Sequence, residues 1–268
     1  MAYFDLGNQI QLYYEDQGQG LPVIFIHGVW MSSRFFHKQM PYFRQRYRAI
    51  ALDLRGHGRS THVHYGHTVA QYARDLRALM HGLALEPVVL IGWSMGAFVI
   101  WEYFKQFGAE NIKATVVIDE SASDYKWPDW PLGFADFPTL CHVMSGLQTD
   151  RAETVRDFIP LMFKDPPAES DVQWMFEEIT RMPESIASAI LFDQTVQDYR
   201  PVLPQIKVPT LLCFGADEKL VPVAAGEHLQ QTMPNARLVV FENSSHCPFL
   251  EEPERFNAEV DRFIQSLG

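Results

Sequence analysis

A short apolar segment runs directly into a G-x-S-x-G sequence and then into a predicted helix. Residues 88–91 are Val-Val-Leu-Ile, whose length and β-branched content are typical of a buried strand. Gly92, Ser94 and Gly96 follow, and residues 97–108 have the composition of a helix. Small residues two places on either side of Ser94 allow a sharp turn that lifts the serine hydroxyl clear of the sheet. A strand, this motif and a helix in that order predict a nucleophile elbow.

The rest of the chain alternates between strand and helix patterns. Residues 68–83 place apolar side chains at helical spacing, with charged side chains on the opposite face. Further strands are predicted at residues 9–14, 21–26, 47–52, 114–118, 210–214 and 238–241, and further helices at 34–43 and 253–267. Because strands that alternate with helices favour parallel pairing, we predict an α/β protein with a mostly parallel central sheet and helices on both faces.

This alternation stops between residues 121 and 204. Residues 125–134 are rich in aromatic residues and proline and show no strand period. Helical stretches are predicted near residues 139–148, 151–163, 170–181 and 184–198. We interpret residues 121–204 as a helical cap inserted into a single core that consists of residues 1–120 and 205–268.

Composition limits the partners and the compartment. A formal net charge of −11 argues against nucleic acid or an anionic membrane as the main partner. Cys141, Cys213 and Cys247 are widely spaced and form no C-x-x-C, which predicts reduced thiols in a reducing compartment. The N-terminal sequence lacks the pattern of a signal peptide, and no run approaches the ~20 apolar residues of a membrane span. We therefore predict a cytoplasmic protein, and leave its oligomeric state open.

A serine nucleophile predicts two further side chains. A base must take the proton of the hydroxyl, and an acid must orient that base. His246 follows the predicted strand at residues 238–241 and precedes the last helix, where such a base is expected. Asp217 and Glu218 follow the strand at residues 210–214 and are candidates for the acid. The order serine, acid, histidine agrees with a nucleophile elbow in an α/β sheet.

The chain resembles the α/β-hydrolase family, in particular its small, cofactor-free esterase, lactonase and perhydrolase branch with a helical cap. The segments that carry the resemblance are His27-Gly28, residues 53–60, residues 92–96, residues 215–222 and Ser245-His246. They extend along nearly the whole predicted core in the family's order, whereas the cap is covered least. The resemblance implies an α/β-hydrolase fold in which the cap is inserted after the sixth strand.

The resemblance also implies an oxyanion hole and a register for the acid. The oxyanion hole would consist of the backbone N–H groups of Val29 and Met95. In the family's usual register the acid lies three residues after a glycine and four before a proline, which favours Glu218 over Asp217. A third candidate is Asp119, at the end of the strand at residues 114–118, a position that some relatives use.

Several aromatic residues are candidates for the substrate pocket. Trp30 and Trp93 flank the two oxyanion positions, and Trp127, Trp130 and Phe134 lie at the start of the predicted cap. They can line an acyl pocket, or they can pack the cap onto the core, and both roles are compatible because packing residues form the walls of such a pocket. The aromatic, charge-poor cap argues against anionic or sugar substrates.

Together these features predict a serine hydrolase of carboxylic esters or lactones of small to medium, mainly apolar type. Carbon–carbon bond hydrolysis, hydroxynitrile cleavage and slow turnover by a ligand receptor are alternatives on the same three residues, and perhydrolysis or other acyl transfer is a possible side activity. No organic cofactor is implied. His62, His64 and His67 share one loop without a supporting carboxylate, so we expect a polar surface there and no metal site.

Overall fold

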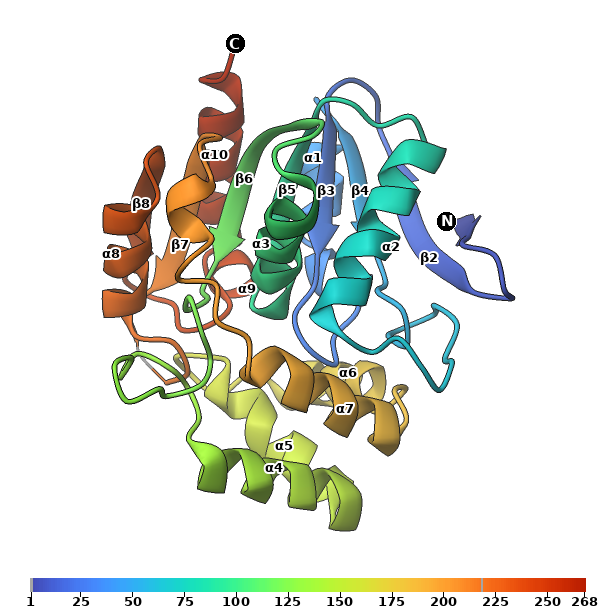
Figure 1. Cartoon of the computed structure of the whole chain (residues 1–268), viewed down its shortest axis with the longest axis vertical. Helices are drawn as coiled ribbons and strands as arrows, with labels where there is room; N and C mark the ends of the chain where they lie inside the picture. Colours follow the sequence, from blue (N-terminus) through green and yellow to red (C-terminus); the bar gives the residue numbers. More distant parts are fainter. Residues whose placement is uncertain (1, 218) are drawn as a thin grey trace.

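The computed structural model describes residues 2–217 and 219–268, and these residues form an eight-stranded sheet in the order β1-β2-β4-β3-β5-β6-β7-β8 (Figure 1). The strands are β1 (Ala2–Asp5), β2 (Gln11–Gln17), β3 (Pro22–Ile26), β4 (Arg48–Leu52), β5 (Val88–Trp93), β6 (Ile112–Ile118), β7 (Thr210–Gly215) and β8 (Ala236–Phe241). β1 and β2 pair antiparallel with their neighbours, and the other strands are parallel. The predicted mostly parallel α/β-hydrolase sheet is confirmed.

The central strands are those with uninterrupted apolar sequences. Every residue of β5 and β7 is buried, as are four of the five residues of β3. Strands buried on both faces need apolar side chains at every position, because helices cover the sheet on either side. β1 was not predicted. It is a four-residue edge strand whose half-buried and exposed positions alternate, so it carries little sequence signal.

Helices of the core lie on both faces of the sheet (Figure 1). α2 and α3 pack against each other on one face, and α1 and α10 lie on the other. The bounds of the core helices are α1 (Met40–Phe43), α2 (Val69–Gly82), α3 (Met95–Phe107), α8 (Val223–Thr232), α9 (Pro248–Glu251) and α10 (Pro253–Gln265). The Thr68 hydroxyl caps α2 by accepting a hydrogen bond from the amide of Gln71.

The predicted helix at residues 34–43 is wrong in extent. The structure has a 3-10 helix at Ser33–Phe36 and the separate one-turn helix α1. Pro41 lacks an amide hydrogen and is tolerated only in the first turn of a helix, so a new helix begins beside it. The Ser32 hydroxyl caps the 3-10 helix by accepting from the amide of Arg34.

In the described part of the chain, four α-helices lie between β6 and β7 and cover the ends of the strands (Figure 1). They are α4 (Phe137–Thr149), α5 (Arg151–Leu161), α6 (Glu169–Ile179) and α7 (Glu184–Thr195), which together are called the cap here. Hydrogen bonds from Ser32 and Trp30 connect the core to the cap. The Ser32 hydroxyl donates to the buried carboxylate of Glu178 at 2.7 Å, and the indole N–H of Trp30 donates to the carbonyl of Ala187 at 3.0 Å. Across the described residues, none of the helices has the length and apolarity needed to cross a membrane.

Candidate active site

Ser94 lies at the turn between β5 and α3, in a backbone conformation that L-residues rarely adopt. Its φ and ψ are 53° and −126°, and it occupies the N-cap of α3. The glycines two places away are required by close packing. A Cβ on Gly92 would lie 2.5 Å from the carbonyl carbon of Gly96, and a Cβ on Gly96 would collide with the carbonyl oxygen of Ile26. The G-x-S-x-G sequence therefore permits a strained turn at Ser94.

His246 lies in the segment between β8 and α9, and its ring is bonded to Asp119. Nδ1 of His246 and Oδ1 of Asp119 are 2.9 Å apart, and both side chains are buried. Because a carboxylate only accepts hydrogen bonds, Nδ1 carries the proton, and Nε2 keeps the lone pair that a general base needs. The second carboxylate oxygen of Asp119 accepts from the amide of Gly215 at 2.8 Å. These two bonds fix the orientation of the imidazole.

Asp217, one of the two acids predicted in the segment after β7, pairs with a lysine and not with His246. Asp217, in the segment that follows β7, has a side chain 39% exposed that lies 3.6 Å from the ammonium of Lys219. Glu218 lies outside the described residues. Asp119 reaches His246 because β6 is the neighbour of β5 in the sheet: Trp93 is paired with Ile118, and the amide of Ser94 donates to the carbonyl of Ile118 at 3.0 Å. Among the described residues, the carboxylate bonded to His246 is that of Asp119, the last of the three sequence candidates.

Val29 and Met95, whose backbone N–H groups are the predicted oxyanion hole, both belong to segments next to Ser94. Met95 is the first residue of α3, and amides in the first turn of a helix have no partner within the helix. Val29 follows Gly28, on which a Cβ would lie 3.1 Å from the Cβ of Ser94. His27 supports this segment: its Nε2 accepts from the amide of Leu54 at 3.0 Å, so its Nδ1 donates to the carbonyl of Gly28 at 2.8 Å.

Burial lowers the pKa of His27 to about 4, so its ring is neutral and serves to hold this loop. A neutral ring can accept at one nitrogen and donate at the other, which is the arrangement observed. His27 is thus a support of the segment that carries Val29.

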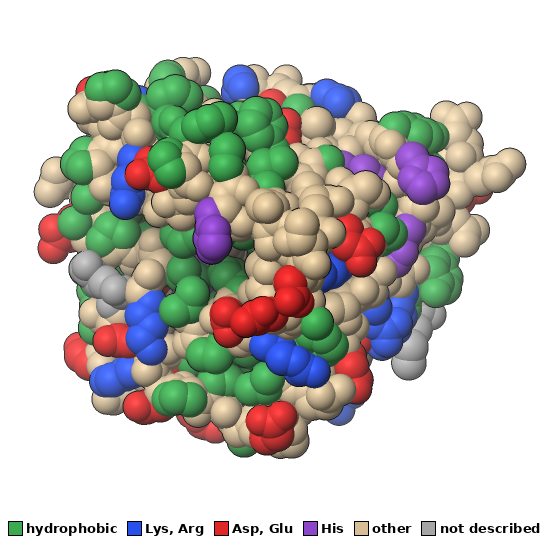
Figure 2. Space-filling view, turned by 90° about the horizontal axis from the view of Figure 1, so that it is seen from below, with side chains coloured by type: hydrophobic (Ala, Val, Ile, Leu, Met, Phe, Trp, Pro, Cys, Tyr) green, Lys and Arg blue, Asp and Glu red, His purple; other side chains and the backbone are tan. Residues whose placement is uncertain are grey.

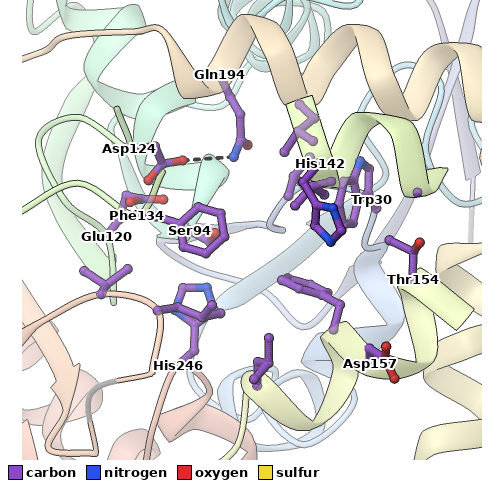
Figure 3. A pocket seen from close by; sticks show the side chains of 18 of the residues that line it. Trp30, Ser94, Glu120, Asp124, Phe134, His142, Thr154, Asp157, Gln194 and His246 are labelled. Carbon is purple, nitrogen blue, oxygen red and sulfur yellow. Dashed lines mark hydrogen bonds between the residues drawn. The ribbon is translucent and has the colours of Figure 1, made fainter. Parts of the chain in front are cut away.

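A cavity of about 520 Å³ lies between the cap and the core, and both Ser94 and His246 line it. In Figure 3 the two side chains lie beside each other at the same part of this cavity. Apolar side chains form much of the wall, namely Val29, Val143, Phe158, Leu161, Leu191, Leu220 and Val221. Trp30 and Phe134, two of the predicted pocket residues, also line the cavity.

Trp93, Trp127 and Trp130 are not among the residues that line this cavity, contrary to expectation, and their indole N–H groups donate hydrogen bonds to residues near the site. Trp93 donates to the carbonyl of His246 at 2.9 Å. Trp127 donates to the hydroxyl of Ser123, and Trp130 donates to the carbonyl of the same residue, each at 3.0 Å. A buried indole N–H needs an acceptor, and these acceptors lie in the segments that carry His246 and Asp119. The three tryptophans support the site from outside the cavity.

Three polar side chains of the cavity wall were not predicted as site residues. Glu120 and Asp124 lie in the segment that follows β6, and Gln194 lies on α7 (Figure 3). All three are buried. Two acidic residues at the carboxyl end of a predicted strand are a sequence signal that could have found Glu120, but Gln194 joins the group only through the packing of the cap.

The mouth of the cavity is more acidic than the cap sequence suggested. Exposed Asp150, Glu153 and Asp157 line it, together with His142. Figure 2, seen from the cap side, shows a hollow with hydrophobic side chains inside it and acidic side chains and a histidine near its edge. The expectation of a charge-poor cap is wrong for this surface.

Comparison with known proteins agrees with this architecture. A model of the alpha/beta hydrolase family matches residues 23–259. The AB hydrolase superfamily protein YisY of Bacillus subtilis is 28% identical, over 98% of this chain and 99% of its own. A pimeloyl-[acyl-carrier protein] methyl ester esterase of Nitrosomonas europaea is 28% identical, over 91% of this chain and 96% of its own. The crystal structure of a bromoperoxidase from Bacillus anthracis is similar with a TM-score of 0.94 and 27% identity, covering 98% of this chain and 99% of its own. The chain belongs to the alpha/beta hydrolase family.

Proposed function

We propose that this protein is a serine hydrolase that cleaves carboxylic esters or lactones of small to medium, mainly apolar type. The observation that carries the proposal is that Ser94, at a strained strand-to-helix turn, lines the same cavity as His246, whose Nδ1 is bonded to Asp119. The esterase relative from Nitrosomonas europaea supports ester chemistry on this fold. The apolar wall of the cavity supports a mainly apolar substrate.

The reaction would proceed through an acyl-enzyme. Nε2 of His246 takes the proton of the Ser94 hydroxyl while the serine oxygen attacks the ester carbonyl. The tetrahedral intermediate then expels the alcohol, which receives that proton from His246. A water molecule, deprotonated by His246, attacks the acyl-enzyme and releases the acid, and the proton returns to Ser94. Asp119 would hold His246 in the tautomer that both steps need.

The amides of Val29 and Met95 would stabilise the oxyanion in both halves of the cycle. One such donor contributes roughly 10²–10³ in kcat, because it is already in place when the charge develops. Since both are backbone groups, a side-chain substitution at either position leaves the donor intact.

The proposal is tested by labelling with a fluorophosphonate and by turnover of p-nitrophenyl butyrate. We expect one covalent label on the peptide that contains Ser94, and steady turnover by the native protein. Ser94→Ala should abolish both, whereas Ser170→Ala, at an exposed serine of α6, should change neither. Turnover that survives Ser94→Ala, or labelling without turnover of any ester, would overturn the proposed function.

A further inference from the structure

A buried cluster of hydrogen-bond acceptors lies in the cavity beside Ser94 and takes no part in the mechanism above. It consists of Glu120, Asp124 and Gln194, which are 1%, 5% and 4% exposed and which line the cavity. In Figure 3 the three side chains lie together on one side of the cavity, next to Ser94 and His246. The carboxylate that orients His246 is that of Asp119, so the cluster is additional to the proposed catalytic residues.

The cluster has more acceptors than the described protein atoms satisfy. Nε2 of Gln194 donates to Oδ2 of Asp124 at 3.0 Å, and the amide of Ser121 donates to Oε1 of Glu120 at 2.7 Å. Oε1 of Gln194 has no hydrogen-bond partner among the described residues. Because a buried acceptor without a donor costs free energy, the arrangement favours a ligand that brings N–H or O–H groups into the cavity.

The cluster also carries negative charge without a cationic side chain beside it. No lysine or arginine belongs to the described lining of the cavity. Burial, with a further contribution from the neighbouring Asp124, raises the pKa of Glu120 well above its ordinary value. Burial also raises the pKa of Asp124 to about 6. Both shifts disfavour a second negative charge on this pair of neighbouring carboxyl groups.

The segment that carries the cluster is held in place from several directions. The hydroxyl of Ser123 donates to the carbonyl of Gln197 at 2.6 Å, and the amide of Tyr199 donates to the carbonyl of Ala122 at 2.9 Å. The indoles of Trp127 and Trp130 donate to Ser123. A site whose acceptors are fixed before the ligand arrives loses little free energy in ordering them.

We propose that Glu120, Asp124 and Gln194 bind a protonated amine, so that the preferred substrates are apolar esters that carry one ammonium group close to the ester. An ammonium supplies both the positive charge that the carboxylates lack and the N–H donor that the unpaired oxygen of Gln194 requires. The acidic mouth formed by Asp150, Glu153 and Asp157 would raise the local concentration of such cations. This inference rests on the proposed ester hydrolysis and specifies its substrate class.

Matched pairs of esters test the inference, because nitrogen and carbon isosteres differ mainly in charge and in one donor. On the alcohol side, 2-(dimethylamino)ethyl acetate is compared with 3-methylbutyl acetate. On the acyl side, methyl 4-(dimethylamino)butanoate is compared with methyl 5-methylhexanoate. The readout is the ratio of kcat/KM for the amine to that for its isostere, measured by titration of the released acid at pH 7. Such a ratio cancels any general change in activity.

We expect a ratio of about tenfold or more on at least one side of the ester, as one favourable charged contact of about 1.4 kcal/mol would give. Asp124→Asn should bring that ratio close to one, because it removes the charge and preserves the shape. The control is Asp165→Asn, which removes the same charge from an exposed loop of the cap and should leave the ratio unchanged. A ratio near one in the native protein, or an equal ratio in native protein and Asp124→Asn, would overturn the inference.

The pH dependence of the ratio gives a second readout. The groups that face Asp124 are Glu120, Gln194 and His246. As the pH falls from 7 to 5 the Asp124 carboxylate takes up a proton, since its pKa is about 6, whereas the amines stay protonated. The ratio should therefore decrease toward one, while any effect of pH on the hydrolysis step itself is shared by both esters. A ratio that is constant across this range would contradict the role of Asp124.

A binding measurement separates this inference from the proposed function. Isothermal titration calorimetry compares 4-(dimethylamino)butan-1-ol with its isostere 5-methylhexan-1-ol, neither of which is an ester. Tighter binding of the amine to native protein, lost in Asp124→Asn, supports the amine site even if no ester is hydrolysed. Equal binding of the two alcohols overturns the amine site, and hydrolysis of 3-methylbutyl acetate would then leave the proposed function standing.

Discussion

At the scale of single residues, the proposed site depends on the carboxylate of Asp119, which lies at the end of β6 and is bonded to His246. Asp119 has a φ of 47°, a conformation that aspartate tolerates better than most residues. Its two oxygens bond Nδ1 of His246 and the amide of Gly215. The Asp119 side chain therefore holds the ring of His246 in place and connects the end of β6 to the end of β7.

Asp119→Asn is expected to lower kcat for p-nitrophenyl butyrate by about 10⁴, because an amide that donates to the imidazole stabilises the wrong tautomer. Asp217→Asn is the matched control and should keep kcat within about threefold, since that side chain is exposed and pairs with Lys219. Steady-state kinetics of the two variants, with circular dichroism to verify folding, decides between them. A larger loss in Asp217→Asn than in Asp119→Asn would show that the acid had been misassigned.

The site residues differ in how far the sequence alone could reveal them. Ser94 and His246 lie in local patterns, a glycine-flanked turn and a loop before the last helix, so both could be predicted. The pairing of Asp119 with His246 depends on strand order, because it joins residues 127 positions apart. The contact between Gln194 and Asp124 spans 70 positions and forms only when α7 packs over the sheet. No local periodicity encodes such contacts.

At the scale of elements, the prediction succeeded for long apolar segments and missed β1, α8 and the break in the helix near Pro41. β5 and β7 are buried throughout and have matching apolar sequences, whereas β1 has four residues with alternating exposure. The helix predicted at residues 34–43 failed because Pro41 begins a new turn. α8 was not predicted at all. Burial of a whole strand leaves a clear sequence pattern, and a four-residue strand or a one-turn helix does not.

The junction of β5 and α3 stores backbone strain, because Ser94 has a φ of 53° and a ψ of −126°. Glycine adopts positive φ with little cost, whereas alanine keeps the steric conflict of serine. Ser94→Gly is therefore expected to be more stable than Ser94→Ala by about 1 kcal/mol.

Urea denaturation of these two variants, both without the nucleophile, measures that difference. Gly108→Ala compared with native protein provides a reference for a second positive φ, of 66°, that lies at the end of the same helix and away from the site. Equal or lower stability of Ser94→Gly would mean that the turn is not strained.

At the scale of the whole molecule, the sheet brings the carboxyl ends of β3, β5 and β6 together, and the cap lies across these ends (Figure 1). The core supplies Ser94, His246, Asp119 and the two backbone amides. The cap supplies much of the wall, including apolar side chains of α4, α5 and α7 and the acidic mouth. Under the proposed function, the core would carry out the reaction, and the cap and the segment after β6 would determine the choice of substrate.

The central claim is that the acyl group of the substrate is transferred to Ser94. The most direct test is rapid mixing of native protein with p-nitrophenyl butyrate, an acid quench during the first turnover, and mass spectrometry of the digested chain. We predict one added butyryl group on the peptide that contains Ser94, and none in Ser94→Ala. Turnover with no acylated peptide, or with the acyl group on another residue, would contradict the account.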